Sequence, residues 1–106
     1  MTFLEWLDRL IAFDTTSRLS NMNLINFVQD WMKRHGAVCT LIRDPKEAKA
    51  NLFATIPANN GRKDGGLILS GHTDVVPVDG QVWDTPPFQM VQKGDRVFGR
   101  GTSDMK

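Results

Sequence analysis

Apolar residues recur at helical spacing near the start of the chain. They follow one face from Leu4 to Ile11, which predicts a helix over about residues 3–13. Its first turn has the form of a capping box, because the Thr2 side chain can accept from the amide of Glu5 while the Glu5 carboxylate reaches back to the amide of Thr2. The run of short polar side chains that follows, residues 14–17, competes for backbone hydrogen bonds and is expected to end the helix.

A second helix is predicted over about residues 21–35. Ser20 or Asn21 is suited to cap its start, and Gly36 suits the left-handed conformation that often follows a helix end. Its apolar stripe consists of Leu24, Val28, Trp31 and Met32. His35 falls in the last turn, where a cation favours the helix dipole, so a structural role is favoured over ligand binding.

After residue 36 the pattern changes to short runs typical of strands. Strands are expected over residues 37–42, 51–56, 67–69, 88–91 and 96–98. Turns are expected at residues 44–47, 59–61 and 93–95. The run Leu67–Leu69 is apolar throughout, which is typical of a strand buried on both faces. These elements predict an α/β fold in which helices cover a mixed sheet, with a strand order that the pattern does not define.

Composition and charge limit which binding partners and which cellular compartment are expected for this chain. The chain has 106 residues, 41% of them hydrophobic, which suits one small domain. Its net charge of +1 is spread over mixed-sign segments, so we expect neither nucleic acid nor a membrane as partner. No secretory signal or membrane-spanning stretch is recognisable. The single cysteine, Cys39, lies in a predicted strand as a buried structural thiol, and a cytoplasmic location is expected.

The first candidate for chemistry follows the apolar run. His72 and Asp74 lie two residues apart just beyond the predicted strand 67–69, so in extended backbone they point to the same side. Ligands of open α/β sheets bind beyond strand ends, and a carboxylate on one imidazole nitrogen leaves the other nitrogen free for a metal. A buried histidine paired with an aspartate for structural reasons is the alternative, and this pair alone does not separate the two.

The second candidate is Asp104, which follows a glycine-rich segment. By itself an aspartate there is more often a capping residue than a ligand. The segment also resembles a phosphate-binding loop superficially, but it lacks the spacing G-x-x-x-x-G-K-[ST].

Three motifs together are more specific. We name them the histidine motif (Gly71–Pro77), the tryptophan motif (Trp83–Phe88) and the glycine motif (Gly99–Lys106). In order and spacing they resemble the first half of the co-catalytic zinc aminoacylase and carboxypeptidase family. The resemblance implies that residues 1–106 are the N-terminal portion of the catalytic, metal-binding domain of a zinc hydrolase, without the lid or dimerisation domain of that family.

The resemblance also implies roles for the candidate residues. His72 is expected to bind one zinc ion, Asp104 to bridge two, and Asp74 to be the catalytic carboxylate that orients His72. Imidazole and carboxylate are ordinary zinc ligands, and paired metals can polarise a carbonyl while holding a hydroxide. Two Zn²⁺ ions per active site are therefore expected as the cofactor, with cobalt as a substitute.

Within the family, three segments look most like the members that deacetylate an N-acetylated amino acid: residues 13–17, 20–21 and 49–56. The implied substrate is a small N-acylated amino acid, and the implied assembly is a homodimer. Desuccinylases, aminoacylases and dipeptidases of the family keep the same three site residues and remain alternatives, as does a non-catalytic remnant of the fold. The family's glutamate pair and remaining ligands are expected after residue 106, so the chain is expected to be a catalytically incomplete fragment.

Overall fold

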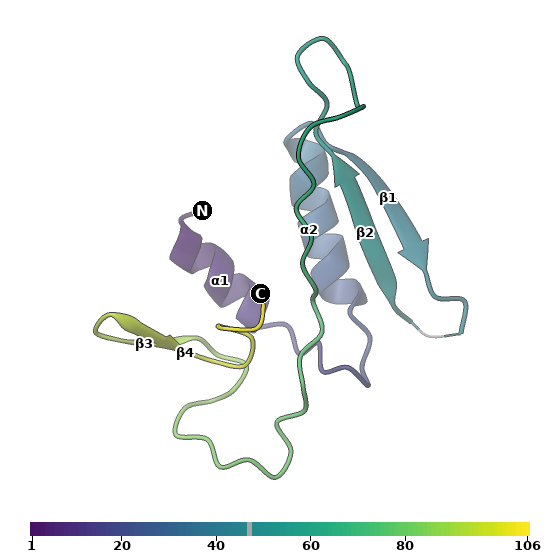
Figure 1. Cartoon of the computed structure of the whole chain (residues 1–106). Helices are drawn as coiled ribbons and strands as arrows, with labels where there is room; N and C mark the ends of the chain where they lie inside the picture. Colours follow the sequence, from purple (N-terminus) through teal and green to yellow (C-terminus); the bar gives the residue numbers. More distant parts are fainter. Residues whose placement is uncertain (47) are drawn as a thin grey trace. The chain divides into compact units, whose positions relative to one another are not determined.

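The computed structural model describes residues 1–46 and 48–106, which group into two compact units (Figure 1). One unit consists of residues 1–19 and 71–106, and the other of residues 20–70. The turn expected at residues 44–47 includes residue 47, which lies outside the described residues. In the part of the chain that the structure describes, no helix is long and apolar enough to cross a membrane.

The first unit opens with α1, Phe3–Ile11, as its capping box and apolar spacing predict. The Thr2 amide donates to the Glu5 carboxylate at 2.6 Å, and the Glu5 amide donates to the Thr2 hydroxyl at 3.3 Å. The apolar face of α1 supplies Leu7 and Ile11 to the core of this unit, and Ile11 is fully buried.

The hairpin expected around Lys93-Gly94-Asp95 is confirmed in the same unit, but its first strand lies at Val91–Lys93, whereas residues 88–91 were expected. Strands β3, Val91–Lys93, and β4, Arg96–Phe98, pair antiparallel. Lys93 pairs with Arg96 across a two-residue turn, and Gly94 there has φ 62°. Glycine at the first position of such a turn is favoured because its backbone twist matches that of the strands.

The second unit contains α2, Met22–Arg34, and the hairpin of β1, Val38–Arg43, and β2, Ala50–Thr55 (Figure 1). The strands pair antiparallel from Val38–Thr55 to Arg43–Ala50, and α2 packs against both. Burial alternates along most of the hairpin, so that one face is more buried than the other. The helix and both strands are confirmed, and Cys39 in β1 is a free, partly exposed thiol.

The start of α2 differs from the expected cap. Asn21 occupies the N-cap position without capping the helix through its side chain. Its amide group instead pairs with the backbone of Ala50, with Nδ2 donating at 2.9 Å and Oδ1 accepting at 3.0 Å. Ser20 Oγ accepts from the Met22 amide at 3.1 Å. Asn21 therefore joins the helix start to β2, and Gly36 ends the helix with the predicted positive φ, 83°.

The α/β class is confirmed, whereas the strand expected at Leu67–Leu69 is wrong. These residues form no strand and are 83%, 80% and 86% exposed. The strands of the described residues form two separate antiparallel pairs, where a mixed sheet was expected. A strand exists only through hydrogen-bonded neighbours. Among the described residues no strand pairs with this run, and its apolar character alone does not make it a strand.

Candidate metal site

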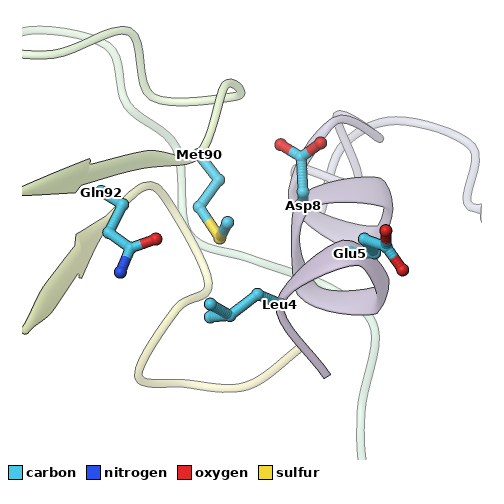
Figure 2. A pocket seen from close by; sticks show the side chains of 5 residues that line it. All are labelled: Leu4, Glu5, Asp8, Met90 and Gln92. Carbon is cyan, nitrogen blue, oxygen red and sulfur yellow. The ribbon is translucent and has the colours of Figure 1, made fainter. Parts of the chain in front are cut away.

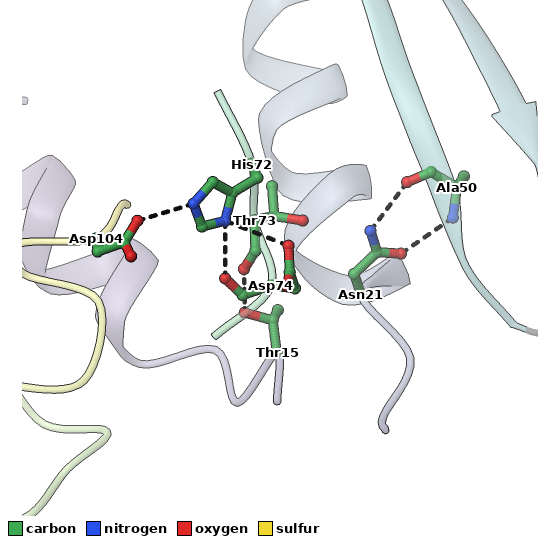
Figure 3. Close-up of polar contacts among 7 residues, drawn as sticks. All are labelled: Thr15, Asn21, Ala50, His72, Thr73, Asp74 and Asp104. Carbon is green, nitrogen blue, oxygen red and sulfur yellow. Dashed lines mark hydrogen bonds and ion pairs between the residues drawn. The ribbon is translucent and has the colours of Figure 1, made fainter. Parts of the chain in front are cut away.

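The structure brings together all three candidate residues, which lie in the first unit (Figure 3). His72 Nε2 lies 2.9 Å from Asp104 Oδ1, although the two residues are 32 positions apart. On the other side of the ring, Nδ1 lies 3.0 Å from the backbone oxygen of Asp74 and 3.2 Å from its Oδ1. Each imidazole nitrogen thus faces oxygen acceptors from one aspartate.

The cluster is open to solvent and anionic. The side chain of His72 is 46% exposed and that of Asp104 is 85% exposed. The alternative of a buried structural pair therefore does not describe His72. The hydrogen bond to Asp104 raises the pKa of the His72 imidazole above its usual value, and the backbone oxygen of Asp74 adds to this. Both contacts favour the protonated ring, because a cation can donate to both aspartates at once.

The backbone that carries His72 is held by residues that follow α1. Thr15 Oγ1 donates to the backbone oxygen of Thr73. Thr16 and Val75 form a parallel bridge, in which the Val75 amide donates to the Thr15 oxygen at 3.1 Å and the Ser17 amide donates to the Val75 oxygen at 3.0 Å. The two threonines and Val75 are buried.

The sequence interpretation missed this role of Thr15 and Thr16, since it treated residues 14–17 as a helix break and as part of a family-like segment. Asp14 Oδ1 accepts from both the amide and the hydroxyl of Thr16, at 3.0 and 2.6 Å, which holds the turn after α1. The signal available in the sequence was the run of four consecutive short polar residues, 14–17, that can bond to backbone and that follow an apolar helix.

Asp104 lies on the glycine motif, which packs tightly on α1 and on itself. A Cβ on Gly99 would lie 2.9 Å from the Ile11 side chain, so only glycine fits there without a shift. Gly101 has φ 97°, and its carbonyl accepts from the Lys106 amide at 3.0 Å. The motif therefore folds back on itself around Asp104 while its first glycine is pressed against the core.

Gly71 contributes space beside His72. A glycine has no side chain and so permits the close approach of a neighbouring group. A Cβ on Gly71 would lie 3.3 Å from the terminal methyl of Met105. The residues directly next to His72 and Asp104 in sequence are therefore neighbours in space as well.

The tryptophan motif is tied to the glycine motif through Arg100. The Arg100 amide donates to the Pro87 oxygen at 2.6 Å, and its guanidinium lies 5.1 Å from the ring centroid of Trp83. Such cation–π contacts stabilise modestly at exposed sites and more when desolvated. Two of the motifs that carry the family resemblance thus contact each other directly.

Other candidates in the described residues do not form a site. His35 stacks on Trp31 at 3.8 Å, and its Nδ1 lies 2.8 Å from the Trp31 oxygen, which agrees with the structural role expected of it. An open pocket beside α1 is lined by Leu4, Glu5, Asp8, Met90 and Gln92 (Figure 2), none of which belongs to the His72 cluster. Among residues 1–46 and 48–106, no group of three or more His, Cys, Asp or Glu side chains is arranged to hold a metal ion.

A protein-family model and several curated proteins are similar to this chain. Residues 68–106 match the model of the peptidase family M20/M25/M40. The chain is 38% identical to the acetylornithine deacetylase of Photorhabdus laumondii subsp. laumondii over 98% of its own length and 28% of the relative. It is 37% identical to that of Pasteurella multocida, over 99% and 28%, and 39% identical to that of Yersinia pestis, over 90% and 25%. The chain thus spans about a quarter of the length of these curated relatives.

The segment that matches the family contains all of the candidate site residues, namely His72, Asp74 and Asp104. It also contains the three motifs on which the resemblance rested. Residues 68–106 are therefore similar to the peptidase family M20/M25/M40, and the chain is similar to acetylornithine deacetylases along nearly its whole length.

Proposed function

We propose that this chain is the N-terminal, metal-binding portion of an acetylornithine deacetylase, a hydrolase that splits N-acetyl-L-ornithine into acetate and ornithine. The observation that carries the proposal is the identity of 38% across 98% of the chain to a protein of that name. Support comes from the pairing of His72 with Asp104, which joins a nitrogen ligand and an oxygen ligand across 32 residues.

The donor set is compatible with zinc. Imidazole nitrogen and carboxylate oxygen are ordinary ligands of Zn²⁺, and metal dependence is general in the peptidase family M20/M25/M40. His72 would hold one ion through Nε2. Asp104 is exposed and has two oxygens, which suits a carboxylate shared between two ions. Bound zinc supplies polarisation of the scissile carbonyl and an acidified water.

The side chain of Asp74 prepares this site by fixing which nitrogen of His72 carries the proton. Asp74 lies at Nδ1 of His72, so a proton held there keeps the lone pair of Nε2 directed at the metal. Nε2 lies within hydrogen-bonding distance of Asp104, so a proton held between them would have to leave for a metal to bind there. Asp74 thus acts as the residue that selects the metal-binding tautomer of His72.

Turnover requires groups that the described residues do not bring to the site. They provide no group of three or more metal-binding side chains, and the chain spans 28% of a curated relative. We propose that a downstream pair of glutamates supplies the general base and a further ligand, as the family resemblance implies. General base catalysis contributes about 10²–10⁴-fold, so the 106 residues alone are expected to be inactive.

We further propose a homodimeric whole enzyme in the cytoplasm. The single free cysteine suits a reducing compartment. The net charge of +1 offers no electrostatic attraction to nucleic acid or to an anionic membrane, so the partner we infer is the small N-acylated amino acid.

The proposal is tested with the protein encoded by the complete gene and with the 106-residue chain in parallel. Acetate release from N-acetyl-L-ornithine is measured with zinc, with cobalt and with chelator, and N-succinyl-diaminopimelate and a dipeptide serve as competing substrates. We expect metal-dependent release from acetylornithine by the complete protein only. Preference for the succinyl substrate or the dipeptide would reassign the substrate within the family. Inactivity of the complete protein towards all three would support a non-catalytic member of the fold.

A further inference from the structure

Lys106 makes a contact that the proposed function does not use. Its ammonium donates to the backbone oxygen of Phe13 at 2.5 Å, across 93 residues of sequence. The same ammonium lies 5.9 Å from the ring centroid of Phe88. Phe13 is the second residue after α1, so the ammonium lies near the C-terminal end of this helix, where partial negative charge favours a cation.

The stem of Lys106 is packed within the glycine motif. A Cβ on Gly101 would lie 3.0 Å from Cδ of Lys106 and 3.2 Å from Cγ1 of Val75. The space that a Cβ on Gly101 would occupy therefore lies between the stem of Lys106 and Val75. Val75 is three residues after His72 in the histidine motif. Since the Lys106 amide also donates to the Gly101 oxygen at 3.0 Å, both the backbone and the side chain of Lys106 fix the turn that contains Asp104.

Both halves of the candidate site converge on one segment, residues 13–17, which we name the anchor segment. The histidine motif is bound to it through the contacts of Thr73 and Val75. The glycine motif is bound to it through the ammonium of Lys106. The two aspartates and the histidine are thus positioned by the same few backbone groups, although they come from motifs about 30 residues apart in the chain.

We propose that Lys106 is a positioning residue for the metal site: by binding the end of α1 it holds the Asp104 turn at the distance from His72 that a shared metal requires. The metal part of this statement rests on the proposed function, whereas the geometric part does not. Lys106 acts through Asp104, and its removal should separate the two side chains without unfolding α1 or the β3–β4 hairpin.

The test compares Lys106→Met, which keeps the apolar stem and removes the donor, with Lys106→Arg, which keeps a cationic donor. Lys93→Met is the matched control, because the Lys93 ammonium also lies over an aromatic ring, Phe98, at 5.5 Å, but on the hairpin. In the metal-free 106-residue chain, NMR measures the cross-relaxation between the His72 ring protons and the Asp104 methylene. We expect this signal to be lost in Lys106→Met, retained in Lys93→Met and largely restored in Lys106→Arg.

Zinc affinity gives the second measurement, on the same substitutions made in the complete protein, by competition with a chromophoric chelator. Loss of a group that orients metal ligands typically weakens affinity by about 10–100-fold, so at least a tenfold weakening is expected for Lys106→Met. Retention of both the NMR signal and the affinity in a folded Lys106→Met chain would overturn the proposal. A lost NMR signal combined with no zinc binding by the unmodified complete protein would support the positioning role and contradict the proposed function instead.

A measurement on the unmodified chain covers the case in which Lys106→Met does not fold. Native-state hydrogen exchange compares the Lys106 amide, bound to Gly101, with the Val75 amide, bound to Thr15. A glycine motif held by the anchor segment should open together with the histidine motif, so the two amides should show equal opening free energies across denaturant. Free exchange of the Lys106 amide while the Val75 amide stays protected would overturn the proposal.

Discussion

Nε2 of His72 lies 2.9 Å from Oδ1 of Asp104, which is the distance of a charge-assisted hydrogen bond. A proton shared by this pair would occupy the place of a metal bound to both side chains, as proposed above. Proton and metal therefore compete directly for this pair, and the predictions about the site follow from that competition.

Zinc binding should weaken as the pH falls. The contacts to Asp104 and Asp74 raise the pKa of His72, so the ring holds its proton to a higher pH than a free histidine does. Below that raised pKa, affinity should fall by about tenfold per pH unit for each proton displaced, and above it the affinity should level off. Calorimetry at several pH values, in buffers of different ionisation enthalpy, counts the released protons. An affinity that is constant from about pH 5 to 8 would contradict the role of His72 as a ligand.

The same pair makes the metal-free fold sensitive to pH in the opposite sense. A raised folded-state pKa means that the folded chain binds the proton more tightly than the unfolded chain. The stabilisation is fully present below the unfolded value, about 6.5, and is lost as the pH rises through the folded value. Urea unfolding of the chain should show this loss, and His72→Gln, which does not titrate, should not.

Asp74→Ala should lower zinc affinity or turnover of the complete enzyme by about 10–100-fold, with the metal still partly bound. The backbone oxygen of Asp74 also contacts Nδ1, at 3.0 Å, and survives the substitution, so we expect the lower end of that range. Asp79→Ala is the matched control, because Asp79 is an exposed carboxylate paired with Arg18 at 2.9 Å, outside the cluster. Equal losses of affinity or turnover in both variants would mean that Asp74 contributes only its negative charge and no specific contact with His72.

Gly99→Ala should destabilise the chain more than Gly71→Ala. The new methyl would lie 2.9 Å from the side chain of Ile11, which is fully buried and cannot move freely. Overpacking of this kind costs about 1–3 kcal/mol. At Gly71 the methyl would meet the flexible end of Met105 at 3.3 Å, which can rotate away. Chemical denaturation of both variants measures the difference, and an equal or reversed order would count against the packing of the glycine motif on α1.

The stabilisation of α1 by its capping box should be lost at acid pH. The hydrogen bond from the Thr2 amide, followed by that from the Thr2 hydroxyl, lowers the pKa of Glu5 below 4.5. A lowered folded-state pKa gives stabilisation that is present above the unfolded value and is lost as the pH falls through the folded one. Thr2→Ala should cost about 1 kcal/mol of stability at neutral pH. Helical circular dichroism between about pH 2 and 6 should reveal the transition and show it abolished in Glu5→Gln.

The parts of the fold that sequence predicted are those defined by neighbours in the chain. The capping box of α1, the positive φ of Gly36 and the turn at Gly94 depend on residues within a few positions of each other. Motif order then identified His72, Asp74 and Asp104 as candidates, and the structure brings them into contact, while their roles in binding metal remain predictions.

What sequence did not predict depends on contacts between distant segments. Thr15 meets Thr73 across 58 residues and Lys106 meets Phe13 across 93, and no local pattern indicates such partners. The run Leu67–Leu69 failed for the converse reason, because its composition indicates a buried strand whereas burial depends on neighbours that the described residues do not provide.

The exposed run Leu67–Leu69 should also determine how the purified chain behaves in solution. Three large aliphatic side chains in sequence are each at least 80% exposed, with no charge among them to repel a second molecule. Burial of one such side chain is worth about 1.5–3 kcal/mol, so any open strand edge that covers the run gains free energy. The chain should therefore scatter light increasingly with concentration and be recovered poorly from overexpression. A single charge in the middle of the run, Ile68→Lys, should keep it dispersed, because a buried lysine would make that pairing unfavourable.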